Sequence, residues 1–155
     1  MERKIKIWIL IAVIFALLLF IFSNSMKNRE DSKSDSDFIV RIVEPFVEKL
    51  LGYVPENLGF IIRKLAHLTE FGTLGFFVCL LVHVQRWAEK KRLYGYAVFG
   101  LLFVAVTDEF IQIFSGRGSS VSDVLRDFCG AVIGSLICFA VVALSLRKNT
   151  KKEKE

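Results

Sequence analysis

Residues Leu65 to Val84 read LAHLTEFGTLGFFVCLLVHV, with Arg63 and Lys64 directly before them and Arg86 shortly after. The run is mainly apolar and matches the roughly 20 residues with which an α-helix crosses a hydrocarbon core about 30 Å thick. Basic residues near both ends are typical of the points where a helix leaves the bilayer. The run therefore predicts a transmembrane helix.

Three further apolar runs repeat this pattern. Of the 155 residues, 54% are hydrophobic and 24% are charged, yet the two classes are segregated along the chain, and the mean hydropathy is +0.49. Such segregation is typical of membrane proteins, and the length leaves room for one domain. We predict an all-α membrane protein with four transmembrane helices in one domain, residues 7–146. The predicted spans are residues 7–22, 65–84, 93–114 and 121–146.

The first run is short and follows Arg3, Lys4 and Lys6, so it is similar in outline to the core of a signal peptide. The stretch after it, Ser23-Asn24-Ser25-Met26, is a poor cleavage site. We therefore interpret the run as an uncleaved first span.

Lys and Arg are concentrated in residues 1–6, in the connection 85–92 and in the tail 147–155. Because basic residues mark the cytoplasmic segments of membrane proteins, we predict that both termini lie in the cytoplasm and that the tail is disordered. The same placement accounts for the excess of 21 Lys and Arg over 16 Asp and Glu, and it excludes a nucleic-acid partner. The sequence indicates a multi-pass protein of the cell membrane.

The predicted outer segment, residues 23–64, contains an amphipathic pattern. Apolar residues recur at helical spacing between Ile39 and Leu51, with Arg41, Glu44 and Glu48 on the opposite face. Pro45 should kink or restart this helix. Since about a dozen residues cannot cross a bilayer, we expect the helix to lie in the outer interface between the first two spans.

Cys79, Cys129 and Cys138 all lie inside apolar runs, are odd in number and show no Cys-x-x-Cys spacing. Free cysteine behaves as a small apolar residue. All three are predicted to be buried and unpaired.

Several polar residues interrupt the apolar runs. Ionisable groups cost about 2.5–3.5 kcal/mol each within a membrane and are functional by default. With a rise of about 1.5 Å per residue, Glu70, Asp108 and Asp127 each lie about 7–9 Å below the outer end of their span. Three helices would thus contribute to one shallow pocket that faces outward. The polar residues concerned are Lys64, His67, Glu70, Asp108, Glu109, Gln112, Arg117, Asp123, Arg126 and Asp127.

A structural role is the alternative. Lys64, Arg117 and Arg126 could pair with carboxylates and lock the helices in register, and Asp123 could cap a helix because it follows Ser120 at a capping-box spacing. However, five carboxylates face only three basic partners and one His. An excess of carboxylates indicates shared protons, a metal or a cationic ligand, so we favour a functional site.

Two motifs carry a resemblance to a known family. One is Lys64-x-x-His67-x-x-Glu70-Phe71-x-x-Leu74-Gly75, and the other runs from Asp108-Glu109-x-x-Gln112 through Gly116-Arg117 to Asp123, Asp127, Gly130 and Gly134. With these motifs the chain resembles the VanZ-like membrane proteins, which are linked to resistance to the glycopeptide teicoplanin. Many members have Asn at the position of Asp127, so a role that needs only an oxygen acceptor there remains open to this chain.

The leading hypothesis is a membrane enzyme that hydrolyses or exchanges phosphate-bearing lipid headgroups, such as those of phospho-polyprenol-linked cell-wall intermediates. His67, Glu70, Asp108 and Glu109 are its candidate catalytic residues, because a His beside carboxylates can act as nucleophile or general base. The candidate substrate-binding residues are Lys64, Gln112, Arg117, Asp123 and Asp127.

No metal ligand is assigned, although a divalent cation on the four candidate catalytic residues remains open. The alternative to an enzyme is an accessory protein that binds a cell-wall precursor or the antibiotic. A proton-coupled carrier fits less well, since the sequence shows neither internal repeats nor a polar site at mid-span.

The predicted topology places Ser119 outside and Lys90 inside. Cysteines substituted at these two positions should therefore label oppositely with a membrane-impermeant thiol reagent in intact cells, with position 119 labelled. Labelling of position 90 alone would overturn the topology.

Overall fold

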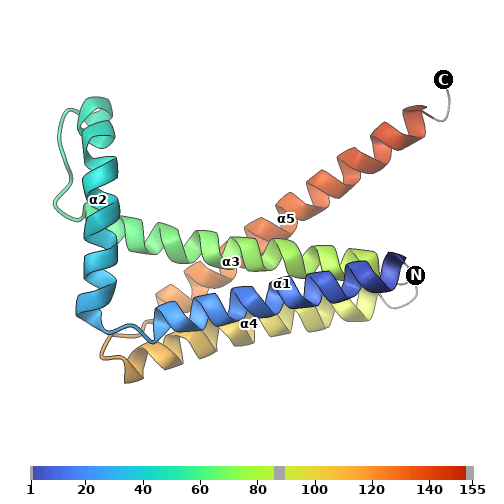
Figure 1. The fold of residues 1–155 in the computed structure, drawn as a ribbon, viewed down its shortest axis with the longest axis horizontal. Coiled ribbons are helices and arrows are strands. Elements are labelled where there is room, and N and C mark those ends of the chain that lie inside the picture. Colours follow the sequence, from blue (N-terminus) through green and yellow to red (C-terminus); the bar gives the residue numbers. More distant parts are fainter. Residues whose placement is uncertain (1, 86–89, 153–155) are drawn as a thin grey trace.

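The computed structural model describes residues 2–85 and 90–152 and shows five α-helices there. In Figure 1, α1, α3 and α4 lie alongside one another, α5 is inclined to them, and α2 lies across one end of the group. The helices are α1 (Glu2–Ser25), α2 (Arg29–Leu51), α3 (Leu58–Val84), α4 (Lys90–Phe114) and α5 (Val121–Lys152). The described residues contain no β-strand, so the predicted all-helical class is confirmed.

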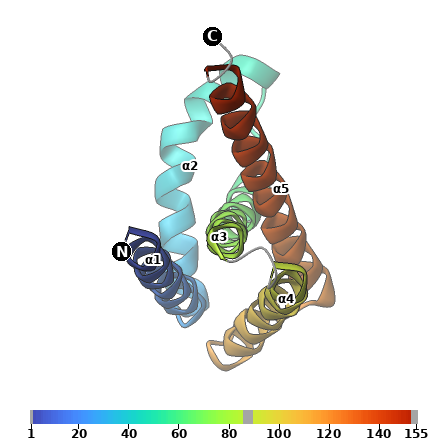
Figure 2. The ribbon, with the colours of Figure 1, turned by 90° about the vertical axis from the view of Figure 1, so that its right-hand side faces the viewer.

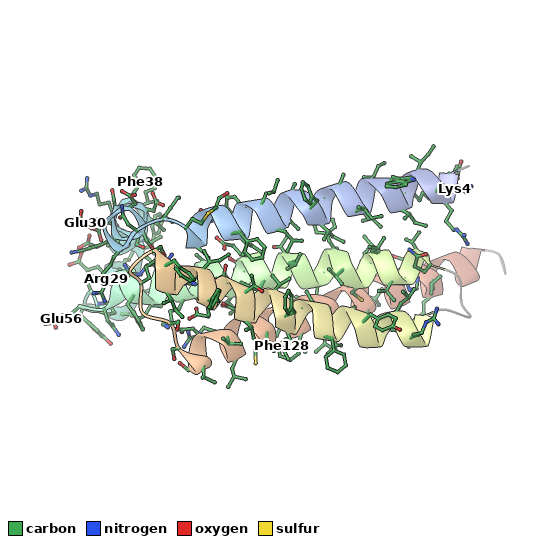
Figure 3. All side chains as sticks on the ribbon, turned by 90° about the horizontal axis from the view of Figure 1, so that it is seen from below. Lys4, Arg29, Glu30, Phe38, Glu56 and Phe128 are labelled. Carbon is green, nitrogen blue, oxygen red and sulfur yellow. The ribbon has the colours of Figure 1, made fainter. Side chains whose placement is uncertain are left out.

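Four of the helices are long and apolar enough to cross a membrane: Glu2–Ser25, Leu58–Val84, Arg92–Phe114 and Val121–Arg147. Each contains one predicted span and extends it at one end or both. Most of their large apolar side chains are exposed, as expected for surfaces that face lipid rather than water. In Figure 3 the labelled charged residues lie at the two ends of the helices, with Lys4 at one end and Arg29, Glu30 and Glu56 at the other.

The contact between α3 and α5 is the most extensive in the fold. It is made by small residues: a Cβ added to Gly75 would collide with the backbone of Ala131, and one added to Gly134 with the backbone of Gly72. Ser135 Oγ adds a hydrogen bond to the Gly75 carbonyl at 3.1 Å. Close backbone approach through small residues is a common way for membrane helices to associate without a hydrophobic driving force. Figure 2 shows α5 crossing beside α3.

A small apolar core lies next to this crossing, where Ile21 of α1 packs with Phe71 and Leu74 of α3. Leu101 and Ala105 of α4 complete it together with Ala131. All four membrane helices thus share one core.

The cysteine prediction is partly wrong. All three cysteines are free, and Cys79 and Cys138 are buried, but Cys129 is exposed on α5. An apolar run does not reveal which of its positions face lipid and which face a neighbouring helix.

Helix α2 is longer than the predicted amphipathic helix. It begins at Arg29 because the Asn28 side chain accepts a hydrogen bond from the Asp31 amide at 2.8 Å, an N-cap that the polar composition conceals. It ends at Gly52, whose positive φ of 77° suits a helix C-terminus. Pro45 is exposed and lies within α2. The helix continues through it, so the expected restart does not occur. Its place at a membrane interface stays a prediction, as does the orientation of the bundle.

Two predicted segments fall partly outside the described residues. The basic connection 85–92 includes residues 86–89, and the tail includes residues 153–155. Helix α5 continues to Lys152 and thus into the predicted tail. The predicted disorder of the tail stays a prediction.

The glycine contact predicts a sharp difference between two alanine substitutions. Gly134→Ala should lower the free energy of unfolding by about 1–3 kcal/mol or more, because the backbone of Gly72 leaves no space for a methyl group. Gly100→Ala, at an exposed position of α4 with nothing near its Cβ, should be neutral or slightly stabilising, since Ala favours helix. Thermal unfolding of the purified variants in detergent measures both. Equal stability of the two variants would contradict the close approach.

Candidate functional site

The buried polar residues gather at one end of the bundle. The C-terminal ends of α1 and α4 meet the N-terminal halves of α3 and α5 there, and α2 lies across them (Figure 1). A cavity of about 180 Å³ opens at this end. The predicted convergence of three spans at one level therefore occurs, with α1 and α2 as additional contributors.

The connection from α4 to α5 is shaped by Gly116. Its positive φ of 72° lets the Gly116 amide bond the Ile113 carbonyl and the Arg117 amide bond the Gln112 carbonyl, which is a Schellman end to α4. The turn directs Arg117 back over the bundle, where Nη1 donates to the Asn24 carbonyl at 3.3 Å. Ser115 Oγ donates to the Ser25 carbonyl at 2.9 Å. Two carbonyls at the end of α1, those of Asn24 and Ser25, thus accept hydrogen bonds from the α4–α5 connection.

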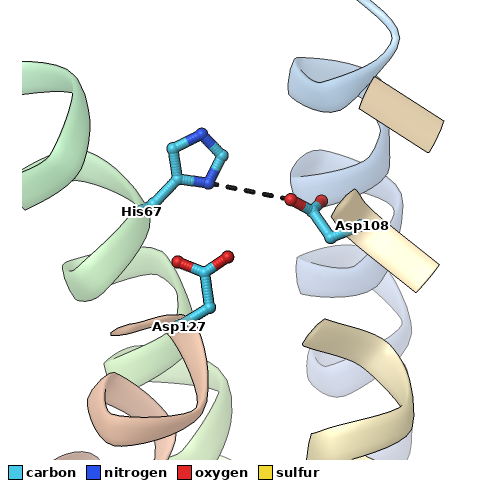
Figure 4. Close-up of side chains that lie close together, drawn as sticks. All are labelled: His67, Asp108 and Asp127. Atoms are coloured by element: carbon cyan, nitrogen blue, oxygen red, sulfur yellow. Dashed lines mark ion pairs between the residues drawn. The ribbon is translucent and has the colours of Figure 1, made fainter. Parts of the chain in front are cut away.

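Asp108 lies at the centre of the site and is fully buried. One of its carboxylate oxygens accepts from Ser25 Oγ at 2.5 Å, and the other accepts from Gln112 Nε2 at 2.8 Å. That second oxygen also lies 3.8 Å from His67 Nδ1 (Figure 4). Asp108 therefore joins α1, α3 and α4 through polar contacts.

His67 lies between a cation and a carboxylate. Arg117 Nη2 is 3.5 Å from Nε2 of the ring. Because a guanidinium can only donate, this contact favours the tautomer with a lone pair on Nε2 and the proton on Nδ1. The Nδ1 proton then faces Asp108 at a distance too long for a hydrogen bond, and Nε2 is the nitrogen able to accept a proton.

Two carboxylate oxygens in the site are buried without a hydrogen-bond partner among the described residues. They are Oδ2 of Asp127, a side chain only 2% exposed, and Oε2 of Glu70. The other oxygen of Glu70 accepts from Asn24 Nδ2 at 3.0 Å. In Figure 4 the Asp127 carboxylate points toward the space between His67 and Asp108.

Glu109 has a different position from its neighbour Asp108. Its Oε2 accepts from the Ser120 amide at 2.9 Å, directly before the first residue of α5, and its Oε1 accepts from Gln112 at 3.1 Å. A carboxylate at this point satisfies a free amide and complements the helix dipole. Ser120 Oγ accepts from the Ser122 amide at 3.1 Å, so Glu109 and Ser120 cap α5 together. The capping role considered for Asp123 is wrong, because Glu109 accepts from the Ser120 amide and Asp123 pairs with Lys64 and Arg126 instead.

At the rim, Asp123 forms ion pairs with both Lys64 and Arg126. The Lys64 ammonium also lies 4.6 Å from the centre of the Phe60 ring, in a cation–π contact. These pairs support the structural interpretation at the rim. Because Lys64 and Arg126 both bind Asp123, neither of them neutralises the deeper carboxylates of Asp108 and Asp127.

Among the described residues, no Lys or Arg forms an ion pair with Glu70, Asp108, Glu109 or Asp127. Hydrogen bonds offset the burial of Asp108 and Glu109, but a buried carboxylate without any partner is costly. Asp127 has the least compensation of the four. The lower part of the site is therefore suited to a cation or a shared proton.

A second, larger hollow of about 540 Å³ lies between α1, α2 and α3. One part of it is apolar, with Phe20, Phe38 and Ile62, and the other part contains Asn24 and Glu70. His67 and Arg117 line both this groove and the smaller cavity. We refer to the two spaces as the cavity and the groove.

The structure brings the sequence-predicted residues into three groups. His67, Asp108, Gln112, Arg117 and Asp127 meet at the centre, Lys64 and Asp123 lie at the rim, and Glu70 and Glu109 turn to Asn24 and to the start of α5. Asn24 and Ser25, which end α1 in the site, were not predicted as site residues. Nor were Arg29, Ser32 and Arg63, which line the cavity. Asn24 and Ser25 could have been found as polar residues at the end of an otherwise apolar helix.

One known protein family matches most of the chain. The family model described as VanZ/LLP1 matches residues 8–143, nearly the whole of the four membrane helices. The chain belongs to the VanZ/LLP1 family. No curated protein and no solved structure matches this VanZ/LLP1 protein. The match spans every polar residue of the site, so the site lies within the VanZ/LLP1 domain itself.

The position of Glu109 predicts how its variants behave. Glu109→Ala removes one part of the cap of α5 and should lower the free energy of unfolding by about 0.5–2 kcal/mol. Glu109→Gln keeps an oxygen for the Ser120 amide and should retain most of that stability. Thermal unfolding and proteolysis within residues 115–120 report on the cap. If both variants are as stable as the wild type, Glu109 does not cap α5.

Proposed function

We propose that this VanZ/LLP1 protein is a membrane enzyme that hydrolyses or exchanges the phosphate-bearing headgroup of a lipid. The observation that supports it is the position of His67 and Arg117 at the junction of a basic cavity and a partly apolar groove. A phospholipid or a polyprenyl phosphate has the same two-part chemistry, with an anionic head on an apolar chain.

The cavity has the charge that a headgroup requires. Arg29, Arg63 and Arg117 line it, and among the described residues none of them forms an ion pair with a carboxylate. Removal from water lowers the pKa of the Arg117 guanidinium, and an anionic ligand would offset that burial. Guanidinium groups bind phosphate through two parallel hydrogen bonds.

Part of the groove has the apolar lining that a lipid chain requires, from Phe20, Phe38, Ile39 and Ile62, and the rest of its lining is polar. Its apolar part lies between α1, α2 and α3, which are helices with many exposed apolar side chains. A chain lying there would stay within the hydrocarbon region while its head reached His67. Under the predicted topology, both spaces face the outer leaflet.

His67 would then act as general base. Its Nε2 would take a proton from water, or from the hydroxyl of an acceptor, as that oxygen bonds to phosphorus. The bond from phosphorus to the leaving oxygen breaks, and the same proton passes to that oxygen. Asp108 stabilises the charged form of the ring, and Arg117 stabilises the charge that develops on the phosphate.

This proposal is tested with purified protein and vesicles that contain phosphatidylglycerol, phosphatidic acid or a polyprenyl phosphate, with products followed by mass spectrometry. His67→Gln should lower turnover by about 10²–10⁴-fold with lipid binding retained, because Gln cannot transfer a proton. Arg117→Lys should mainly weaken lipid binding, since it keeps the charge and loses the fork. Thr69→Ala, two residues from His67 on the exposed side of α3, is the matched control.

Cells provide the second measurement, in a glycopeptide susceptibility assay. If the wild type turns over none of these lipids, and His67→Gln keeps full activity in cells while Arg117→Lys fails, the protein is a binder of lipid-linked precursors or antibiotic and not an enzyme.

A further inference from the structure

We infer that His67, Asp108 and Asp127 form a binding site for one divalent transition-metal ion. Each residue offers a ligand atom, and the three atoms all lie within 4.8 Å of one another (Figure 4). The residues come from α3, α4 and α5, so a cation there would join three consecutive helices of the bundle.

Two of the three proposed ligand residues have a buried polar atom without a hydrogen-bond partner in the described part of the chain. Oδ2 of Asp127 and Nδ1 of His67 are both buried without a hydrogen-bond partner among the described residues. Asp127 is almost fully enclosed and points into the space between the other two side chains. Two neighbouring carboxylates without a basic partner repel each other in a medium of low dielectric constant, and a cation removes that repulsion.

The surroundings already hold the ligands in place. Ser25 and Gln112 donate to Asp108, so its carboxylate is oriented by two partners, as carboxylate ligands of metals commonly are. Zn²⁺ binds such ligands at about 2.0–2.2 Å, so the three atoms would need to close by about 1 Å, which small side-chain rotations supply.

The donor set selects among cations. One imidazole nitrogen with two carboxylate oxygens suits Zn²⁺ or Mn²⁺, whereas Mg²⁺ and Ca²⁺ prefer oxygen ligands alone. Both His67 and Asp127 line the cavity, so a further coordination position of the ion would face it. A phosphate oxygen could occupy that position, and this last step alone rests on the proposed function.

The contact of His67 with Arg117 sets a condition for binding. Coordination through Nδ1 requires the ring proton on Nε2, which then opposes the donor Nη2 of Arg117, 3.5 Å away. Cation binding should therefore release Arg117 from His67 toward the cavity, where it is free to meet an anion. With its proton on Nε2, a metal-bound His67 no longer acts as general base, so the metal-bound state and the base role are alternatives for this residue.

The test uses the full chain in detergent, stripped with EDTA and then titrated separately with Zn²⁺, Mn²⁺, Mg²⁺ and Ca²⁺. We expect about one tightly bound Zn²⁺ or Mn²⁺ per chain by elemental analysis, with a rise in thermal unfolding temperature. Loss of a residue that only orients a metal ligand weakens metal binding about 10–100-fold. Loss of the ligand itself in Asp127→Leu should therefore weaken metal binding at least tenfold. Leu125→Ala, two residues away on an exposed face of the same helix, should bind as the wild type does.

His67→Phe supplies a second ligand deletion should Asp127→Leu fail to fold. Wild-type protein that binds neither Zn²⁺ nor Mn²⁺, or ligand variants that bind as tightly as the wild type, would overturn the site in favour of a proton shared by the two carboxylates. Because binding is measured without lipid, the result is independent of the proposed activity. Stoichiometric binding without lipid turnover would overturn only the proposed enzyme, and turnover in EDTA would overturn only a role of the metal in that turnover.

Discussion

The close approach of α3 and α5 is the constraint on which the rest of the structure depends. Lipid offers no hydrophobic gain when two apolar helices associate, so the pair is held by backbone contact at glycines and by a few polar bonds. The next turns of the two helices carry His67 and Asp127. If the backbones stood apart by the width of a side chain, these two residues could not share one space with Asp108.

The site also depends on an imbalance of charge. Two of the cations that line the cavity, Lys64 and Arg126, both bind Asp123 at the rim, and none of the described Lys and Arg residues forms an ion pair with the deeper carboxylates. A protein selected only for stability would gain by replacing Asp127 with an apolar residue of similar size. Its presence in a buried, unpartnered position is what makes this part of the fold suited to a ligand.

Much of this architecture could be predicted from the sequence. The positions of the spans followed from hydropathy, and the common depth of Glu70, Asp108 and Asp127 followed from the rise of a helix. Hydropathy could not show that Cys129 faces outward, because it does not distinguish lipid from protein as apolar surroundings. Spacing along one helix suggested Asp123 as the partner of Ser120 in the cap of α5, whereas the actual partner, Glu109, comes from a different helix. The contributions of Asn24 and Ser25 likewise depend on tertiary contacts that no local pattern contains.

The attachment of α1 has a consequence for biosynthesis. Helix α1 is the first to be made, but its polar end bonds to Glu70, Asp108, Ser115 and Arg117, which are synthesised later. Membrane helices insert individually before they associate, and synthesis proceeds from the N-terminus. During translation, α1 therefore stands in the bilayer before the partners of the Asn24 and Ser25 side chains have been made. His67, Asp108 and Asp127 come together only after α5 has been synthesised, so the polar centre is the last part of the fold to form.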